Sequence, residues 1–360
     1  MRPELILVVV KLALWLAGWL VLGRVILGSA RSRAAAPVLA GPATASGAPA
    51  LQNLSIIIPA RNEEHNLPVL LRSINAQAGR PLEVIVVDDA STDRTAVIAR
   101  QLGATVIASQ PLPDGWRGKT WACHQGAQAA RGDWLLFLDA DTWLESNGLG
   151  KILAAYTGGA LSVGPYHAVR QLYEQLSAFF NLVMVAGTVP GGLFGQMLLV
   201  DRESYRRAGG HEAVRGQILE NFWLAGRFRA AGVAVRSVTG KGAIAFRMYP
   251  NGLRELVEGW TKGFASGASR TPLAILLLIV AWMTGMMLGA WWVPVTPWVA
   301  VVYALYAGQV AMLLRQVGAF RWYTALLYPV PLVFYFAVFT RSALRSGKQV
   351  TWKGRTIRAD

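Results

Sequence analysis

The stretch that decides the fold is Trp134-Leu135-Leu136-Phe137-Leu138-Asp139-Ala140-Asp141, an apolar run that ends in two carboxylates separated by one small residue. An uninterrupted apolar run of this length is typical of a buried strand. Ligands of open α/β sheets bind at the carboxyl ends of the strands, and two carboxylates there suit Mg²⁺ or Mn²⁺ holding a diphosphate. A strand that ends in a solvated acidic turn has the same pattern, so the motif alone leaves both interpretations open.

The composition indicates that part of the chain lies in lipid. Of its 360 residues 54% are hydrophobic and 14 are tryptophan, which is rich for a soluble protein. The formal net charge of +15 raises the question of nucleic-acid binding. Residues 51–271 hold 22 lysines and arginines against 18 acidic residues, whereas the two flanks hold 13 against 2. The charge therefore belongs to segments beside apolar spans, and we expect no nucleic-acid partner.

The N-terminus is predicted to anchor the chain in the membrane. The apolar segment 5–27, interrupted by Lys11 and Arg24, has the length of a membrane span, and Arg24 near its end with Arg31 and Arg33 after it serve as cytoplasmic anchors. A signal peptide is the alternative, but its apolar core is shorter, which favours an uncleaved anchor over residues 1–33 with its N-terminus outside. Residues 34–50, rich in Ala, Pro and Gly, are interpreted as a linker. The single cysteine fits a reducing compartment, so we expect a multi-pass protein of the cell membrane with a cytoplasmic central domain.

The central region, residues 51–246, alternates strand-length apolar runs with helix-length amphipathic stretches. The predicted strands are 54–59, 82–88, 104–108, 134–139, 195–201, 233–238 and 243–247, and the predicted helices are 63–77, 92–102, 119–130 and 220–231. This alternation indicates βαβ units and a mostly parallel, Rossmann-like α/β sheet. Asp93 or Ser91 is expected to cap the second helix.

The remaining segments are predicted to contact the membrane. An aromatic amphipathic stretch at 172–183 is interpreted as a helix on the membrane surface, followed by a flexible loop at 190–192. Residues 247–271 form an interface segment, and residues 272–340 contain three apolar segments at 273–293, 298–314 and 322–339.

The basic tail, residues 341–360, constrains how many of these segments cross. Three crossings from a cytoplasmic domain would place the tail outside, against the positive-inside tendency. We therefore expect one segment not to cross. Pro329 and Pro331 favour the last segment, which they would turn back as a re-entrant hairpin.

Three predicted strands deliver acidic groups to one edge of the sheet. The first ends in Ile58-Pro59-Ala60-Arg61-Asn62-Glu63, the second in Val87-Asp88-Asp89-Ala90-Ser91, and the third in Asp139-Ala140-Asp141. Like charges at this density destabilise one another unless a cation or hydrogen-bond donors compensate them. A ligand site is therefore a better interpretation than a solvated surface.

These motifs resemble family 2 glycosyltransferases of the GT-A fold in their order and spacing, over roughly residues 55–246. The resemblance implies a GT-A catalytic domain, with a mostly parallel sheet, between N-terminal and C-terminal transmembrane helices. It implies that Pro59, Ala60, Arg61, Asn62, Glu63 and Asp89 or Asp88 bind the nucleotide. It also implies that Asp139, Ala140 and Asp141 bind a diphosphate through Mg²⁺ or Mn²⁺, with Asp141 as the better candidate for a direct ligand.

A glycine-bracketed loop, Gly115-Trp116-Arg117-Gly118-Lys119, opens the third helix. Free amides at a helix N-terminus and a lysine can hold phosphate, although a loop lysine is more often simply solvated. The resemblance favours a place for Lys119 near the diphosphate, because family members often carry Gly-Lys at this point.

The expected catalytic base departs from the family pattern. Family members typically have a Glu-Asp pair that opens a helix after a Gly-Gly turn, and the Asp takes the acceptor's proton. Here the turn is Gly209-Gly210-His211 and the pair is Glu220-Asn221, and an asparagine side chain cannot act as that base. Three explanations remain: Glu220 is the base, which we prefer, or the acceptor is a carboxylate that arrives ionised, or catalysis is impaired.

Further motifs resemble the membrane-bound carotenoid-acid and hopanoid-associated branch of the family. They are the loop at Trp116, the run Arg247-Met248-Tyr249-Pro250, Trp260 with Lys262, and the tail motif at Trp352. The branch implies a lipid acceptor, with Gly209, Gly210, His211, Arg247, Trp260 and Lys262 on the acceptor side. We expect transfer of one sugar, glucose from a UDP-sugar donor, to a polyisoprenoid-type lipid. The alternatives are a polyprenyl phosphate or glycolipid acceptor, or a non-catalytic scaffold that binds nucleotide sugars.

Overall fold

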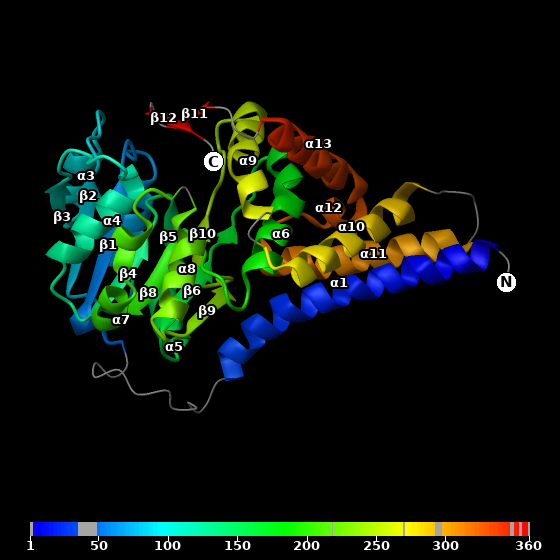
Figure 1. The fold of residues 1–360 in the computed structure, drawn as a ribbon, viewed down its shortest axis with the longest axis horizontal. Coiled ribbons are helices and arrows are strands. Elements are labelled where there is room, and N and C mark those ends of the chain that lie inside the picture. The colour runs from blue at the N-terminus through cyan, green and yellow to red at the C-terminus, as the bar shows by residue number, and fades with distance from the viewer. Residues whose placement is uncertain are drawn as a thin grey trace.

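The computed structural model describes residues 3–34, 49–217, 219–268, 271–291, 297–345, 349–352 and 355–358. Figure 1 shows an α/β domain from which a group of long helices extends. The central sheet has the strand order β3-β2-β1-β4-β8-β6-β9. Its strands are β1 (Leu54–Ala60), β2 (Glu83–Asp88), β3 (Thr105–Ala108), β4 (Trp134–Leu138), β6 (Ala160–Gly164), β8 (Met197–Asp201) and β9 (Val235–Thr239). Only β8 runs antiparallel to its neighbours, so the predicted mostly parallel sheet is confirmed.

The sheet is covered on both faces, which explains its continuous apolar strands. Successive residues of β1 point to opposite sides: Ile56 and Ile58 pack into one core and Ile57 into the other. The first core includes α2 (Leu67–Asn75), α3 (Thr95–Gln101) and α5 (Gly148–Ala154), and the second includes α4 (Gly118–Ala129), α7 (Arg202–Arg207) and α8 (Glu220–Ala230). A second sheet, β5 (Thr142–Leu144), β10 (Ile244–Phe246) and β7 (Tyr166–His167), adjoins the first.

Two of the predicted helices start later than the sequence pattern suggested. The segment before α2 is a loop, because the amides of Glu63 and Glu64 bind Thr95 Oγ1 (2.8 Å) and Asp93 Oδ2 (3.1 Å) instead of continuing a helix. Asp93 Oδ1 accepts the amide of Thr95 at 2.9 Å, but α3 begins at Thr95 with Arg94 at its N-cap and no side-chain capping bond, so the predicted cap by Asp93 or Ser91 is not present. Ser91 instead uses its hydroxyl to accept the amide of Asn62.

The long helices α1 (Pro3–Ala34), α10 (Leu273–Trp291) and α11 (Pro297–Val317) lie side by side, directed away from the sheet (Figure 1). Among the described residues, these three are the helices long and apolar enough to cross a membrane, over Val8–Val25, Leu273–Ala290 and Ala300–Val317. The last predicted apolar segment is divided into α12 (Trp322–Leu326) and α13 (Pro329–Arg345). Pro329, which has no amide hydrogen to donate, begins α13.

Hydrogen bonds between distant parts of the chain hold α1 in this group of helices. Gln309 on α11 accepts a hydrogen bond from Trp282 Nε1 of α10 at 2.6 Å and donates one to the carbonyl of Trp15 at 3.1 Å. Tyr306 donates to the carbonyl of Lys11 at 2.8 Å. Polar side chains that bond across apolar helices in this way fix how the helices pack.

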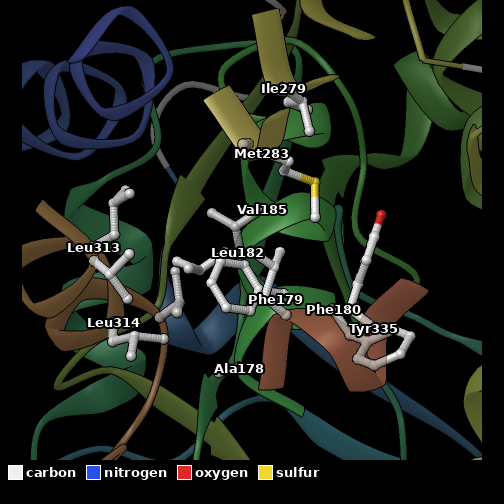
Figure 2. Packing of buried hydrophobic residues seen from close by; sticks show 14 of the residues in the cluster. Ala178, Phe179, Phe180, Leu182, Val185, Ile279, Met283, Leu313, Leu314 and Tyr335 are labelled. Carbon is white, nitrogen blue, oxygen red and sulfur yellow. The ribbon is translucent and has the colours of Figure 1, made fainter. Parts of the chain in front are cut away.

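The helix α6 (Ala178–Thr188) is enclosed, which corrects the prediction of a helix on the membrane surface. Phe179 and Phe180 have 0% exposed surface. Figure 2 shows residues of α6 packed among side chains of α10, α11 and α13, such as Met283, Leu313 and Tyr335. A helix that is apolar on nearly all sides buries itself completely, whether its surroundings are protein or lipid.

The α/β domain and the helices are joined by specific polar contacts. The 3₁₀ helix η2 (Tyr173–Ser177), which directly precedes α6, carries Gln175. The Oε1 atom of Gln175 accepts the amide of Arg321 at 3.1 Å and the hydroxyl of Thr324 at 2.5 Å. Trp260 of α9 (Leu253–Ala268) donates to Ser177 Oγ at 3.0 Å. These bonds fix the position of η2 relative to α9 and to the start of α12. Near the C-terminus, β11 (Gln349–Trp352) pairs antiparallel with β12 (Arg355–Arg358).

Candidate active site

The ends of β1 and β2 form one preformed rim. Asp89 donates its amide to the carbonyl of Ala60 at 2.8 Å, and Arg61 Nη1 donates to the carbonyl of Asp89 at 2.6 Å. Asn62 accepts the amide of Thr92 at 2.8 Å. Asn62 (φ 53°) and Ala90 (φ 54°) both adopt left-handed conformations, which are strained for residues with a side chain and cluster at functional sites. The structure thus brings the residues predicted to bind the nucleotide together.

The acidic groups on this rim have cationic or hydrogen-bonding neighbours. Asp89 is buried, and its Oδ2 lies 4.0 Å from Arg61 Nη1. Asp88 Oδ1 accepts the amide of Ser91 at 3.2 Å, and Glu63 Oε2 accepts the side-chain amide of Asn66 at 2.9 Å. The chain itself thus supplies a cation and hydrogen-bond donors that compensate the negative charges on this rim.

Lys119 lies at the centre of the site, where it joins three segments that are far apart in the sequence. Its Nζ lies 2.8 Å from Oδ1 and 3.0 Å from Oδ2 of Asp139 at the end of β4. The same nitrogen lies 3.0 Å from Glu220 Oε1 on the first turn of α8 and 2.8 Å from the carbonyl of Gly195 before β8. Because β8 is antiparallel, its N-terminal end meets the carboxyl end of β4, and this brings Gly195 to the site.

The electrostatics of this cluster favour a charged lysine. Burial lowers the pKa of the Lys119 ammonium, but the carboxylates of Asp139 and Glu220 outweigh this effect and raise its pKa above the ordinary value. With 34% of its side chain exposed, Lys119 can still reach a ligand from solvent. The site therefore presents a positively charged ammonium beside the acidic end of β4.

The loop that carries Lys119 is held in place by the 3₁₀ helix η3 (Gly210–Val214) and the turn after it. The carbonyl of Arg215 accepts the amide of Arg117 at 2.9 Å and the hydroxyl of Thr120 at 2.8 Å. The N-terminus of α4 is thereby oriented toward the end of β4. This geometry fits the predicted phosphate-binding loop.

A small cavity beneath Lys119 is lined by His211, Asn221 and Glu220 together with apolar side chains. Burial lowers the pKa of His211 to about 3, helped by the nearby charge of Lys119, so the imidazole is neutral at pH 7. Its Nδ1 lies 2.8 Å from the hydroxyl of Tyr205, which also accepts the His211 amide at 3.0 Å. Asn221 donates its side-chain amide to the carbonyl of Leu193 at 2.5 Å.

The chemistry of the acidic residues fits a divalent metal whose remaining ligands come from a substrate. Both oxygens of Asp139 contact Lys119, which makes Asp141 the better candidate for direct coordination. Within the described ranges, no three His, Cys, Asp or Glu side chains are grouped to hold an ion. Mg²⁺ and Mn²⁺ need only one or two carboxylates when phosphate oxygens and water complete the ligand set.

Comparison with known proteins agrees with this geometry. Residues 55–173 match the model of the family described as Glycosyl transferase family 2. The 4,4'-diaponeurosporenoate glycosyltransferase of Staphylococcus aureus (strain MRSA252) is 37% identical over 332 residues, which cover 84% of this chain and 87% of the relative. The chain belongs to glycosyltransferase family 2.

Two further comparisons extend the result. The enzyme of the same name from Staphylococcus haemolyticus (strain JCSC1435) is 40% identical over 251 residues, covering 65% of this glycosyltransferase and 67% of the relative. The structure of a mannosyltransferase from Pyrobaculum calidifontis, in complex with GDP-mannose and Mn²⁺, superposes with a TM-score of 0.51 at 20% identity over 94% of this chain and 98% of that chain. At this identity the superposition shows the shared GT-A fold.

The residues predicted on the acceptor side of this family 2 glycosyltransferase do not all face its site. Arg247 binds Glu174 Oε1 through two nitrogens, at 2.6 and 2.9 Å, and Glu174 is fully buried. Trp260 stacks on Phe180 with ring centroids 4.7 Å apart. Both side chains thus belong to the junction with the helices. Lys262 lies on α9, but its side chain is outside the described part of the structure.

Backbone conformation and packing explain why two glycines stand in the Gly209-Gly210 turn of the glycosyltransferase. Gly209 (φ 81°) and Gly210 (φ 52°) adopt left-handed conformations, and a Cβ on Gly210 would lie 2.6 Å from the ring of Tyr205. The turn therefore seats Tyr205 against His211, which lines the cavity beneath Lys119.

Sequence reasoning missed several residues of the site. The sequence predicts a flexible loop at 190–192 and a strand from 195 and assigns neither a role in the site, yet the carbonyl of Gly195 binds Lys119 and that of Gln196 accepts the Asp139 amide at 2.9 Å. The sequence indicates Tyr249 only as part of the motif at 247–250, yet burial and then the charge of Asp141 raise its pKa. The density of glycine in the loop was the one signal that could have indicated a close approach of its backbone to the site.

Proposed function

We propose that this protein is a membrane-bound, inverting glycosyltransferase that transfers one glucose from UDP-glucose to a lipid acceptor that is a carotenoid acid. The observation that carries the proposal is the 37% identity to a 4,4'-diaponeurosporenoate glycosyltransferase across 84% of the chain. That match is long enough to include apolar helices as well as the nucleotide-binding edge. A soluble donor site joined to apolar helices suits a reaction between a water-soluble donor and an acceptor dissolved in lipid.

The donor would bind along the carboxyl edge of the sheet. The rim at residues 59–63 and 88–89 would hold the uridine, and the N-terminus of α4 with Lys119 would face the diphosphate. Mg²⁺ or Mn²⁺, held by Asp141 with support from Asp139, would neutralise the diphosphate as it leaves. The mannosyltransferase of the same fold was determined with Mn²⁺.

The proposed membrane topology has three crossings. With the N-terminus outside, α1, α10 and α11 would place both the catalytic domain and the basic tail in the cytoplasm, in agreement with the positive-inside tendency. In this arrangement α12 and α13 return along the cytoplasmic side of the cell membrane. A cysteine introduced at residue 346 should react with an impermeant reagent only after cells are opened; labelling of intact cells would contradict the topology.

Transfer assays with purified full-length protein in lipid nanodiscs test the activity. With Mn²⁺, UDP-glucose and a carotenoid carboxylic acid, we expect a glucosylated lipid by mass spectrometry and no product from Asp141→Ala. Product from a polyprenyl phosphate or a glycolipid instead would assign the acceptor to that class. Because the pair reads Glu220-Asn221, a scaffold without activity is the second candidate, and donor binding without turnover on any acceptor would establish it.

A further inference from the structure

The described side chains around the cavity offer no group that can take a proton without breaking a contact that shapes the site. Asn221 has no basic atom, and its amide is bound to Leu193. His211 is buried, its Nδ1 is bound to Tyr205, and burial lowers its pKa to about 3. Burial also raises the pKa of the Cys123 thiol, which stays protonated.

Among the described side chains that line the cavity, the carboxylates are those of Asp139 and Glu220, and Lys119 pairs with both. The lysine is shared between Glu220 at 3.0 Å and Asp139 at 2.8 Å. Protonation of Glu220 would remove one of the two negative charges that hold the ammonium between α4, β4 and α8. Glu220 is therefore placed to position Lys119, which faces the predicted diphosphate site.

We infer that this enzyme transfers its sugar without a protein general base, because its acceptor is a carboxylate that attacks already ionised. The inference rests on the proposed glycosyltransferase function. In the step, a carboxylate oxygen forms a bond to the anomeric carbon while the bond from that carbon to the β-phosphate oxygen breaks. The bonding electron pair leaves with the nucleoside diphosphate. The acceptor's negative charge passes to the diphosphate, so no proton is transferred and the product is a glycosyl ester.

One neutral position in the cavity suits an anionic acceptor. Asn221 lines the cavity beside Glu220 without a charge, whereas Lys119 already pairs with the carboxylates of Asp139 and Glu220. An aspartate at position 221 would repel an incoming carboxylate, whereas it would help an alcohol to lose its proton. We therefore expect Asn221→Asp to slow transfer to a carboxylate and to speed transfer to an alcohol. The substitution only replaces the side-chain NH₂ group by an oxygen, so the shape of the cavity is kept.

The experiment compares a carotenoid carboxylic acid with the alcohol of the same chain, using full-length protein, Mn²⁺ and UDP-glucose. We expect transfer to the acid, transfer to the alcohol slower by about 100-fold or more, and no slowing of the transfer to the acid in D₂O. Asn221→Asp should slow transfer to the acid. Equal rates with acid and alcohol, or faster transfer to the acid in Asn221→Asp, would overturn the inference.

A second variant separates the role of Glu220 from general-base catalysis. Glu220→Gln should mainly raise the KM for UDP-glucose and lower kcat less than about tenfold, because it weakens the hold on Lys119. A loss of about 10²- to 10⁴-fold in kcat with unchanged donor KM is the signature of a missing base and would overturn the inference. Faster transfer to a polyprenyl phosphate would overturn the carboxylate assignment. Failure of the wild type to bind UDP-glucose would instead refute the proposed function.

Discussion

The ring of Tyr249 lies directly on the backbone of Gly259, where an added Cβ atom would be 2.0 Å from Cε1 of the tyrosine. Tyr249 adopts a left-handed conformation (φ 55°), and its carbonyl accepts the hydroxyl of Tyr173 at 2.9 Å. Because the charge of Asp141 also acts on this tyrosine, Tyr249 connects the end of the site at Asp141 with α9.

Gly259→Ala should therefore disturb both stability and activity. The new methyl group must displace the Tyr249 ring, and overpacking of this kind costs about 1–3 kcal/mol. We expect a lower melting temperature by tryptophan fluorescence in detergent and slower sugar transfer. Gly226→Ala on α8 is the matched control, since a Cβ there meets nothing within 4 Å and alanine favours a helix. Equal melting temperatures for the two variants would show that the ring moves without cost.

The ion pair between Arg247 and Glu174 should act in stability rather than in acceptor binding. Arg247→Met leaves a fully buried carboxylate without its cation, which we expect to lower the free energy of unfolding by about 3 kcal/mol. The double variant Glu174→Gln/Arg247→Met should recover much of that loss together with transfer activity. Arg254→Met, whose side chain is 93% exposed, serves as the control and should have no measurable effect. A double variant that is stable but inactive would return Arg247 to the acceptor site.

Gln309 should hold α1 against α10 and α11. Gln309→Leu removes one hydrogen bond to Trp282 and one to Trp15, each worth about 0.6 kcal/mol and at most about 1.7 kcal/mol in a membrane. A protease site placed between residues 40 and 44 allows α1 to be cut from the rest of the chain. After cleavage, α1 should co-purify with the wild type and be partly lost from Gln309→Leu. Met312→Leu, on an exposed part of α11, is the control; loss of α1 from all three proteins would contradict the packing described.

His211 should make the protein less stable in mild acid. Its pKa is about 3 in the folded state and about 6.5 in an unfolded chain, so the unfolded state binds the proton first as the pH falls. The contribution of neutral His211 to the free energy of unfolding is complete above pH 6.5. It declines as the pH falls toward 3, with a slope of up to about 1.4 kcal/mol per pH unit. In thermal unfolding between pH 6.5 and 4.5, His211→Gln should reduce the slope relative to the wild type. His65→Gln is the control, because that side chain is 92% exposed and lies outside the cavity; equal slopes in all three proteins would show that folding does not lower the pKa of His211.

The parts of the fold that depend on local pattern were predictable from the sequence. The strands β1, β2 and β4 begin and end within one or two residues of the predicted limits, because continuous apolar runs bounded by polar residues have few alternatives. The break at Pro329 followed from the chemistry of proline in the same way. By contrast, α6 was placed at the membrane surface because an apolar aromatic helix has the same sequence signature whether protein or lipid covers it.

The sequence alone determined that carboxylates would collect at the carboxyl edge of a parallel sheet, and that a metal-bound diphosphate would suit them. These conclusions depend on residue type and on strand order. Only the tertiary structure decided which charges pair. Lys119 meets Asp139 and Glu220, which are 20 and 101 residues away in the sequence, because the antiparallel β8 and the first turn of α8 bring their ends to β4. An ion pair needs atoms within a few ångströms of each other, and that proximity arises from packing between distant segments.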